Sequence, residues 1–302
     1  MCHSSDVGGT RSALARRARK MPVLRHYPTT WLTAGWDGWR HRREYDDVRR
    51  YVMFVGHPRT GHSLVGALLD AHPNALVAHE LDALKYVEAG FDRRRLYALL
   101  GRTEQRRVAS GHRSSTGYQY AVPGQWQGRH RRLDVIGDKK GGRSTLRIGD
   151  DPGLLDRLRS CVGVDVAVIQ VVRNPFDVIA TMHRRAPRRS LEDCAGLFFH
   201  LSDVVDEVRK RVPDELFHEL HHEQLVADPR GTLVDLCSFV GLEAPVDYLD
   251  ACASVVFDAP RHTRAGAPWT PELTELVAAQ SAGHRSLAGY RFGDIVTEEG
   301  AR

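Results

Sequence analysis

A short apolar run, a glycine-containing loop and an amphipathic helix follow one another near the start of the regular part of the chain. The run is Tyr51 to Val55, and its position before Gly56 and Pro58 predicts a buried strand. Leucines and valines at four-residue spacing predict a helix over residues 63–71, which a His-Pro-Asn tripeptide ends. Strand, tight loop and helix in this order indicate the first unit of a parallel sheet.

Strands and helices go on alternating along the chain, which predicts an α/β fold with a central parallel sheet and helices on both faces. Residues 164–172 are apolar on both faces apart from Gln170, as a central parallel strand requires. Residues Ser190 to Asp193 have the form of a capping box and open a long helix that Pro213 ends. The other predicted strands cover residues 75–79, 134–137 and 216–225, and the other predicted helices cover residues 81–90, 175–184 and 232–240.

The charge and the patterning divide the chain into three parts. Residues 1–50 hold eleven Lys or Arg and five Asp or Glu, so they form a basic N-terminal arm in a chain whose net charge is +5. Residues 51–295 form the α/β domain, with a long loop excursion at about residues 101–132, and residues 296–302 form a C-terminal tail. The arm is expected either to contact an anionic surface or to pack loosely on the domain, and no nucleic-acid partner is expected.

Several classes of protein are excluded by composition. The apolar share of 42% and the moderate glycine and proline content are typical of a globular chain. No stretch is apolar for long enough to cross a bilayer, and the first ten residues lack a signal-peptide core, which predicts a cytoplasmic protein. The five cysteines are widely spaced without a Cys-x-x-Cys pair, so we expect reduced thiols and no thiolate zinc site.

The loop from Gly56 to Ser63 reads GHPRTGHS and has the glycine spacing of the phosphate loop G-x-x-x-x-G-K-S/T, with His62 at the lysine position. Such a loop aims backbone N–H groups and a helix N-terminus at an anion, as in P-loop NTPases. The usual lysine that reaches the outer phosphates of a triphosphate is missing, and Arg59 supplies a cation from within the loop. The other interpretation is an ordinary strand-to-helix turn.

A second candidate anion site follows the predicted central strand, where Arg173 opens the sequence RNPFD and Thr181 lies one helical turn beyond Asp177. A phosphate-loop NTPase normally ends this strand in a carboxylate that holds magnesium. An arginine at the carboxyl end of the strand suits a second phosphate, although a surface ion pair is the alternative.

Together, these two motifs resemble the donor-binding motifs of the sulfotransferases that use 3′-phosphoadenosine-5′-phosphosulfate (PAPS). The resemblance extends from about Tyr51 to Phe292, because residues 222–229 (HEQLVADP) are also similar to a late strand-to-helix segment of that family. The chain differs in having arginine at position 59 where many members have lysine, His-Ser at positions 62–63 in place of Thr-Thr, and threonine at position 181 in place of serine.

The resemblance implies that PAPS is the sulfuryl donor, that 3′,5′-diphosphoadenosine (PAP) is the product, and that no metal is required. It assigns the 3′-phosphate to Arg173 and Thr181, and also to Arg261 and Arg264 in a late segment that resembles one closing over the donor. The residues of the phosphate loop that would hold the 5′-phosphosulfate are Pro58, Arg59, Thr60, Gly61, His62 and Ser63.

Catalysis of sulfuryl transfer needs a cation for the leaving phosphate oxygen and a base for the acceptor hydroxyl. Arg59 is the predicted cation, and Lys139 is expected either to stabilise a sulfuryl oxygen or to be a solvated lysine. Glu80 is the first candidate base and His79 the second, because both lie at the end of the predicted strand after the phosphate-loop helix. This segment resembles the place where several carbohydrate- and tyrosine-modifying sulfotransferases keep a catalytic glutamate. The alternative for Glu80 is a place near a helix N-terminus, where it favours the dipole.

The acceptor is expected to be a hydroxyl, or less readily an amine, of a small molecule or glycan. Three aromatic side chains of the loop excursion, Tyr118, Tyr120 and Trp126, are expected either to line the acceptor pocket or to pin the loop to the domain.

Two other functions remain open from the residues alone: a magnesium-dependent nucleotide or small-molecule kinase with an altered phosphate loop, and a nucleotide-binding module without turnover. Residues 218–222 also fit H-E-x-x-H, the helical zinc signature of metalloproteases. Because we predict a strand there, the zinc interpretation is not favoured.

Overall fold

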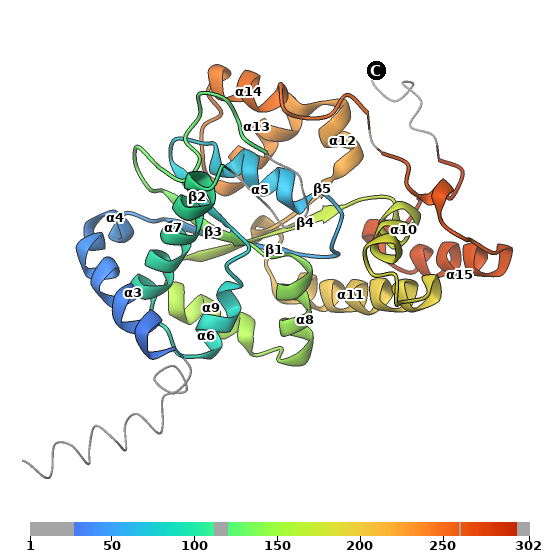
Figure 1. The fold of residues 1–302 in the computed structure, drawn as a ribbon, viewed down its shortest axis with the longest axis horizontal. Coiled ribbons are helices and arrows are strands. Elements are labelled where there is room, and N and C mark those ends of the chain that lie inside the picture. The colour runs from blue at the N-terminus through green and yellow to red at the C-terminus, as the bar shows by residue number, and fades with distance from the viewer. Residues whose placement is uncertain (1–26, 112–119, 260, 295–302) are drawn as a thin grey trace, which may run out of the picture.

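The computed structural model describes residues 27–111, 120–259 and 261–294 (Figure 1). Its five described strands form one parallel sheet in the order β2-β3-β1-β4-β5. The strands are β1 (Arg50–Val55), β2 (Ala75–His79), β3 (Val135–Lys139), β4 (Asp165–Val172) and β5 (Phe217–His221). The predicted α/β fold class is therefore confirmed.

Helices cover both faces of the sheet (Figure 1). On one face the core is built with α6 (Ala83–Glu88), α7 (Arg93–Ala109), α8 (Gly142–Asp150), α9 (Leu154–Val162) and α11 (Leu191–Arg211). The other face carries α5 (His62–Asp70), α12 (His222–Ala227), α13 (Pro229–Val240) and α14 (Val246–Ala253). The remaining helices are α3 (Pro28–Arg40), α4 (Arg42–Asp46), α10 (Pro175–Arg185) and α15 (Pro271–Ala282), with short 3-10 turns η1 (Asp214–Leu216), η2 (Arg264–Gly266) and η3 (Arg285–Leu287).

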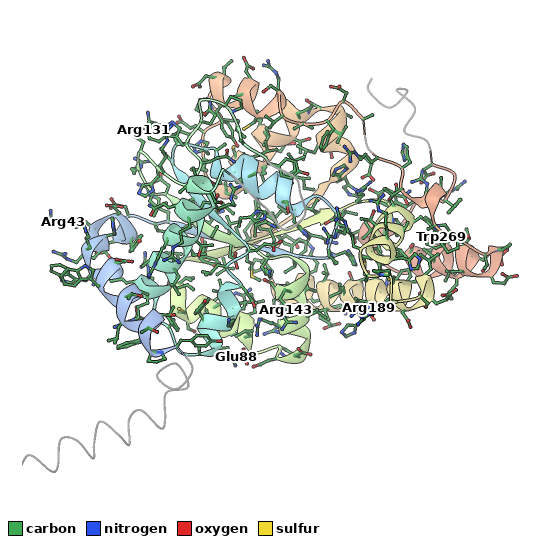
Figure 2. The ribbon with its side chains drawn as sticks, viewed as in Figure 1. Arg43, Glu88, Arg131, Arg143, Arg189 and Trp269 are labelled. Carbon is green, nitrogen blue, oxygen red and sulfur yellow. The ribbon has the colours of Figure 1, made fainter. Side chains whose placement is uncertain are left out.

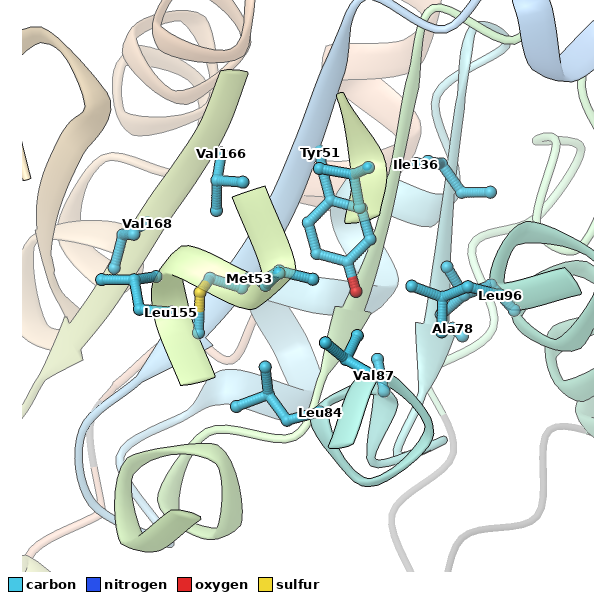
Figure 3. Close-up of a cluster of buried hydrophobic side chains, with 14 of the residues drawn as sticks. Tyr51, Met53, Ala78, Leu84, Val87, Leu96, Ile136, Leu155, Val166 and Val168 are labelled. Carbon is cyan, nitrogen blue, oxygen red and sulfur yellow. The ribbon is translucent and has the colours of Figure 1, made fainter. Parts of the chain in front are cut away.

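The period-two alternation of the strands creates the two cores. On β1, Tyr51 and Met53 point to the first face, where they join Leu84 and Leu155 (Figure 3). Val52 and Phe54, which alternate with them on β1, belong to the cluster on the opposite face. A third cluster joins α10, α11 and α15 beyond the end of β4. The sheet is therefore buried on both sides, as its apolar strands require.

The loop predicted at residues 101–132 begins with a helix, because α7 extends to Ala109. The prediction was wrong for these residues for a physical reason. The last turns of α7 bury a polar pair, in which the Arg107 guanidinium donates to the Glu104 carboxylate at 2.6 Å. A buried ion pair leaves no apolar periodicity for sequence analysis to detect. The rest of the predicted excursion has no helix or strand among its described residues.

Part of the predicted basic arm is folded: α3 and α4 occupy residues 28–46, and α3 packs closely on α7. At Gly38 a β-carbon would lie 2.8 Å from the Arg94 carbonyl oxygen, so glycine permits this approach. Residues 1–26 of the arm and the tail at residues 296–302 lie outside the described residues. Within the described part of the chain, no helix has the length and apolarity that a membrane crossing requires.

The strand predicted at residues 216–225 ends at His221, where the chain turns into α12. His218 therefore lies on β5, with its ring stacked on Phe239 at 4.9 Å between centroids, whereas His222 begins a helix. The two histidines do not share a helix face, which the zinc signature of the metalloproteases needs.

Candidate active site

The carboxyl ends of the parallel strands meet at one edge of the sheet, which is where open α/β sheets bind ligands. A cavity of about 400 Å³ lies there. It is lined by segments at the ends of β1, β2, β3 and β4, by α8, α10, α11 and α12, and by Phe257, Ala259, Arg261 and Thr263. These segments lie far apart along the chain, so only the sheet topology brings them together.

The loop after β1 has the geometry of an anion cradle. Gly56 and Gly61 adopt φ of 117° and 113°, a region that favours glycine. A β-carbon on Gly61 would lie 2.7 Å from the ring of His222, so the loop also depends on a close approach. Thr145 on α8 secures the start of the loop, because its Oγ1 accepts a hydrogen bond from Gly56 N–H at 2.8 Å. At the start of α5, Leu64 and Val65 donate their N–H groups to the Gly61 carbonyl at 2.9 and 3.2 Å, so the N–H groups of His62 and Ser63 are the ones that the helix N-terminus offers to an anion.

His62 at the lysine position supports the loop from within. Its Nε2 donates to the Val55 carbonyl at 3.0 Å, and its Nδ1 lies 3.3 Å from the Thr60 hydroxyl. Burial lowers the pKa of His62 to about 4, and the charge of Lys139 acts in the same direction. The ring is therefore neutral at pH 7. Thr60, fully buried, donates to the His57 carbonyl, so these two residues shape the loop while Pro58, Arg59, Gly61 and Ser63 face the cavity beside His62.

Arg173 brings the second motif next to the phosphate loop. It follows β4, and its guanidinium donates to the Arg59 carbonyl at 3.4 Å and to the Arg261 carbonyl. Thr181, two turns into α10, lies with its hydroxyl 2.9 Å from that of Thr263. All five residues border the cavity. The two motifs, which are far apart in the sequence, therefore form one site.

Glu80 and Lys139 form an ion pair on the cavity wall, with 2.9 Å between Oε1 and Nζ. Lys139 also donates to the Ser63 hydroxyl at 2.9 Å, and Lys140 reaches the other carboxylate oxygen of Glu80 at 3.3 Å. Burial opposes ionisation of Glu80, but the two lysines outweigh it and lower the pKa of Glu80 to about 2. Glu80 adopts φ of 66°, a left-handed conformation that is strained outside glycine and is typical of functional positions.

His79, the second candidate base, lies outside the cavity lining. Its backbone N–H donates to the buried Glu104 carboxylate at 2.8 Å. Burial and then the charge of Lys139 lower the pKa of His79 to about 3. The strand end therefore presents Glu80 to the cavity and ties His79 to α7.

The remaining predicted residues divide between the cavity and its surroundings. Tyr120 and Arg261 line it, and Arg261 also lies over the Phe257 ring at 5.1 Å. Arg264 is buried outside the lining and donates to the Asp177 carboxylate at 2.6 Å. Trp126 is also outside the lining, where its backbone N–H donates to the Ala71 carbonyl. Tyr118 lies outside the described residues.

Several cavity residues carried no prediction. His222 lies beside the phosphate loop at the carboxyl end of β5, and burial followed by the nearby Arg173 charge lowers its pKa to about 3. The sequence signal that could have placed His222 in the site is its position directly after a predicted strand, because ligands bind at the carboxyl ends of parallel strands. Two of the other unpredicted lining residues, Lys140 and Thr263, lie next to or between predicted ones. The rest have no motif around them, and they are Gly142, Arg143, Leu146, Arg184, Arg185, Leu197, Leu201, Phe257 and Ala259.

Two carboxylates near the strand ends are already engaged by the protein. Asp138 on β3 accepts backbone N–H bonds from Leu81 and Ala83 at 3.0 and 2.7 Å. Asp177 on α10 holds Arg264. Among the described residues, no three His, Cys, Asp or Glu side chains come together as metal ligands would.

Comparison with known proteins gave one family match. Residues 165–246, which span β4 to the start of α14, match the family described as the sulfotransferase family. No curated protein sequence matches the chain.

Solved structures of sulfotransferases are similar to this chain. Sulfotransferase STF1 from Mycobacterium tuberculosis matches with a TM-score of 0.50 and 16% identity, over 83% of this chain and 81% of that chain. STF9 from Mycobacterium avium matches with a TM-score of 0.48 and 12% identity, over 93% and 87% of the two chains. Mouse sulfotransferase SULT7A1, solved in complex with PAP, matches with a TM-score of 0.42 and 11% identity, over 79% and 84%. The likeness to STF1 supports the fold, and the family match supports the predicted resemblance over residues 165–246, which hold the second motif and residues 222–229 but not the phosphate loop.

Proposed function

We propose that this chain, of which residues 165–246 match the sulfotransferase family, transfers a sulfuryl group from PAPS to a hydroxyl of a small molecule. The observation that carries the proposal is the contact between the two anion motifs. Arg173 reaches the backbone of Arg59 at 3.4 Å, so a cation suited to a second phosphate lies against the phosphate loop. A donor with phosphate groups at both its 5′ and 3′ positions needs two such sites at one cavity.

The residues around the cavity fit this donor by their chemistry. Arg59, Ser63 and the first-turn N–H groups of α5 would hold the 5′-phosphosulfate, as expected for an anion at a helix N-terminus. Arg173, Thr181 and Arg261 would hold the 3′-phosphate. Arg264 would act indirectly, because its bond to Asp177 supports the helix that carries Thr181. Bound PAPS supplies the sulfuryl group, and the protein supplies position and charge.

The roles of the side chains follow from their places. Arg59 would stabilise the charge that develops on the leaving phosphate oxygen, which is the largest catalytic contribution that a transfer of this type requires. Lys139, already bonded to Ser63, would stabilise the transferred group. Lys139 is buried, so water weakens its field little, whereas Arg59 is partly exposed at the mouth of the loop.

Glu80 is the proposed general base, because it borders the cavity and His79 does not. Its ion pairs with Lys139 and Lys140 make it a weak base in the free protein. A donor oxygen that engages Lys139 takes that charge away from Glu80, and the basicity of the carboxylate then rises. Proton removal is thereby coupled to donor binding.

Replacing Glu80 by glutamine is expected to lower kcat by about 10²- to 10⁴-fold, the usual contribution of a positioned base. The KM for PAPS should stay within about threefold, because glutamine keeps the size of the side chain. Steady-state kinetics with His79→Gln as the matched control tests this, and near-normal turnover of Glu80→Gln would remove Glu80 from the mechanism.

The pH dependence of the wild type provides a second test of Glu80. Since the pKa of Glu80 is lowered to about 2, this base becomes protonated only well below neutral pH. The kcat/KM of the wild type should therefore not fall until the pH drops below the ordinary glutamate pKa of about 4.3.

The donor is tested by calorimetric titration with PAP, with ADP, and with ADP plus magnesium. PAP is expected to bind at least about tenfold more tightly than ADP, because only PAP offers a 3′-phosphate to Arg173, and magnesium should have no effect on PAP. Equal affinities, or ADP binding that requires magnesium, would make a kinase the better interpretation. No contact among the described residues favours that alternative, since Asp138 and Asp177 are engaged by the protein.

The acceptor class, the cytoplasmic location and the role of the basic arm stay predictions. Glycan hydroxyls belong to the proposed range of acceptors. Deleting residues 1–26 tests the arm, because a salt-sensitive association with an anionic surface should then be lost while PAP binding is retained.

A further inference from the structure

We propose that the acceptor is an amphiphilic anion: a hydroxyl-bearing molecule with an apolar body and an acidic group. This inference rests on the proposed function and names the substrate class for that site. The acceptor hydroxyl would lie near Glu80, its apolar body along Leu146, Leu197 and Leu201, and its acidic group at Arg143 and Arg184. All of these residues border the cavity.

The cavity carries more positive charge than the donor needs. Among the described residues that line it, Glu80 is the single carboxylate, against eight basic side chains, which are Arg59, Lys139, Lys140, Arg143, Arg173, Arg184, Arg185 and Arg261. PAPS brings about four negative charges, two from the 3′-phosphate and one each from the 5′-phosphate and the sulfate. A surplus of positive charge therefore remains in the cavity after the donor is bound, and it favours an anionic second substrate.

Two of the surplus charges, Arg143 and Arg184, belong to neither of the two donor motifs. Arg143 is on α8 (Figure 2), and Arg184 is in the last turn of α10, beyond Thr181. Neither guanidinium takes part in an ion pair with any residue that the structure describes, whereas Lys139 and Lys140 share Glu80. These two arginines are therefore the charges that a second anion can engage.

Helix electrostatics do not account for Arg143. A cation in the last turn of a helix is favoured by the helix dipole, and this is sufficient to explain Arg184 at the end of α10. Arg143 lies in the first turn of α8, where the same dipole disfavours a cation, and the turn contains no acidic residue to offset it. A basic side chain that is unfavourable for its own helix and borders a cavity points to a ligand.

Three leucines give the same cavity an apolar wall. Leu146 lies three residues after Arg143 and thus on the same side of α8. Leu197 and Leu201, four residues apart on α11, complete the wall. The two helices cross closely, since a β-carbon on Gly149 would lie 2.9 Å from Val204. Leucine side chains suit an alkyl or terpenoid body better than the polar face of a sugar, so an amphiphile fits this wall better than a glycan.

The test compares two probes of equal length on protein saturated with PAP: ω-hydroxydecanoate and decane-α,ω-diol. Calorimetric titration should show that the acid binds at least tenfold more tightly than the diol. The double variant Arg143→Ala/Arg184→Ala should remove this preference and leave the affinity for PAP unchanged. Arg188→Ala is the matched control, because Arg188 is an exposed arginine close to α10 that does not border the cavity. Transfer of labelled sulfate from PAPS then shows whether kcat/KM follows the same order.

The possible results distinguish a failure of the anionic-acceptor proposal from a failure of the proposed sulfotransferase function. Failure of the wild type to bind PAP would overturn the proposed sulfotransferase function. Tight PAP binding with equal affinities for acid and diol, or with no binding of either probe, would overturn the anionic acceptor alone. An unchanged preference in the double variant would overturn the assignment to Arg143 and Arg184. Thermal unfolding of each variant shows that the fold is retained.

Discussion

Replacing Arg59 by alanine is expected to lower kcat by about 10²- to 10³-fold, the range found when one donor to a developing negative charge is removed. Arg59 borders the cavity within the phosphate loop, at φ of 79°. Charge on the leaving oxygen is larger in the transition state than in bound PAPS, so the loss should fall mainly on kcat and only slightly on the KM for PAPS.

The control for Arg59 separates charge from backbone geometry. Alanine and arginine are both L-residues in a left-handed conformation, so Arg59→Ala neither adds nor relieves strain. Arg59→Lys restores a positive charge at the same place and should recover part of the lost rate. Steady-state kinetics on both variants provides the measurement, and a kcat for Arg59→Ala close to the wild-type value would show that this arginine has no part in the transfer step.

Replacing Arg173 by alanine is expected to weaken PAP binding by about 10- to 100-fold, since a hydrogen-bonded contact to a charged group contributes about 1.5–3 kcal/mol. ADP has no 3′-phosphate, so its affinity should change little, and the preference of the protein for PAP over ADP should disappear. Thr181→Ala should act in the same direction with a smaller effect, because a neutral hydroxyl contributes less than a guanidinium.

A second role of Arg173 has to be separated from this effect. Its guanidinium also holds the carbonyl oxygens of Arg59 and Arg261, so alanine at this position could loosen the cavity. Thermal unfolding and ADP titration of Arg173→Ala measure such loosening independently. A parallel loss of PAP and ADP affinity would assign Arg173 to the architecture of the loop and would contradict the 3′-phosphate site.

Local sequence patterns determined most elements of the fold. The apolar run before Gly56 became β1, residues 75–79 became β2 without a shift, and the capping box at Ser190 opens α11 with both of its hydrogen bonds. Proline at the first position of α10 is another signal that acts within one turn. These signals are short-range, so the sequence carries them whatever the rest of the chain does.

Predictions from these local patterns were wrong where the buried residues are polar. The end of α7 buries Glu104 with Arg107, and His222 starts a helix where a strand pattern continued. Both segments are stabilised by contacts with elements far away in the sequence, such as the His79 backbone for Glu104 and the phosphate loop for His222. A pattern of period two or 3.6 contains no information about such partners.

The two phosphate motifs could be predicted from the sequence, because the groups that would bind a phosphate in each motif lie within a few residues of one another along the chain. Their meeting was decided by the tertiary structure, since only the parallel pairing of β1 with β4 places Arg173 against Arg59. The choice of Glu80 over His79 for the cavity wall, and the place of Arg143 on the cavity lining, depend in the same way on the sheet order and on the helices packed around it. Spacing along a chain sets which groups are near neighbours on one element, whereas a cavity is built from several elements, whose packing sets the distances between them.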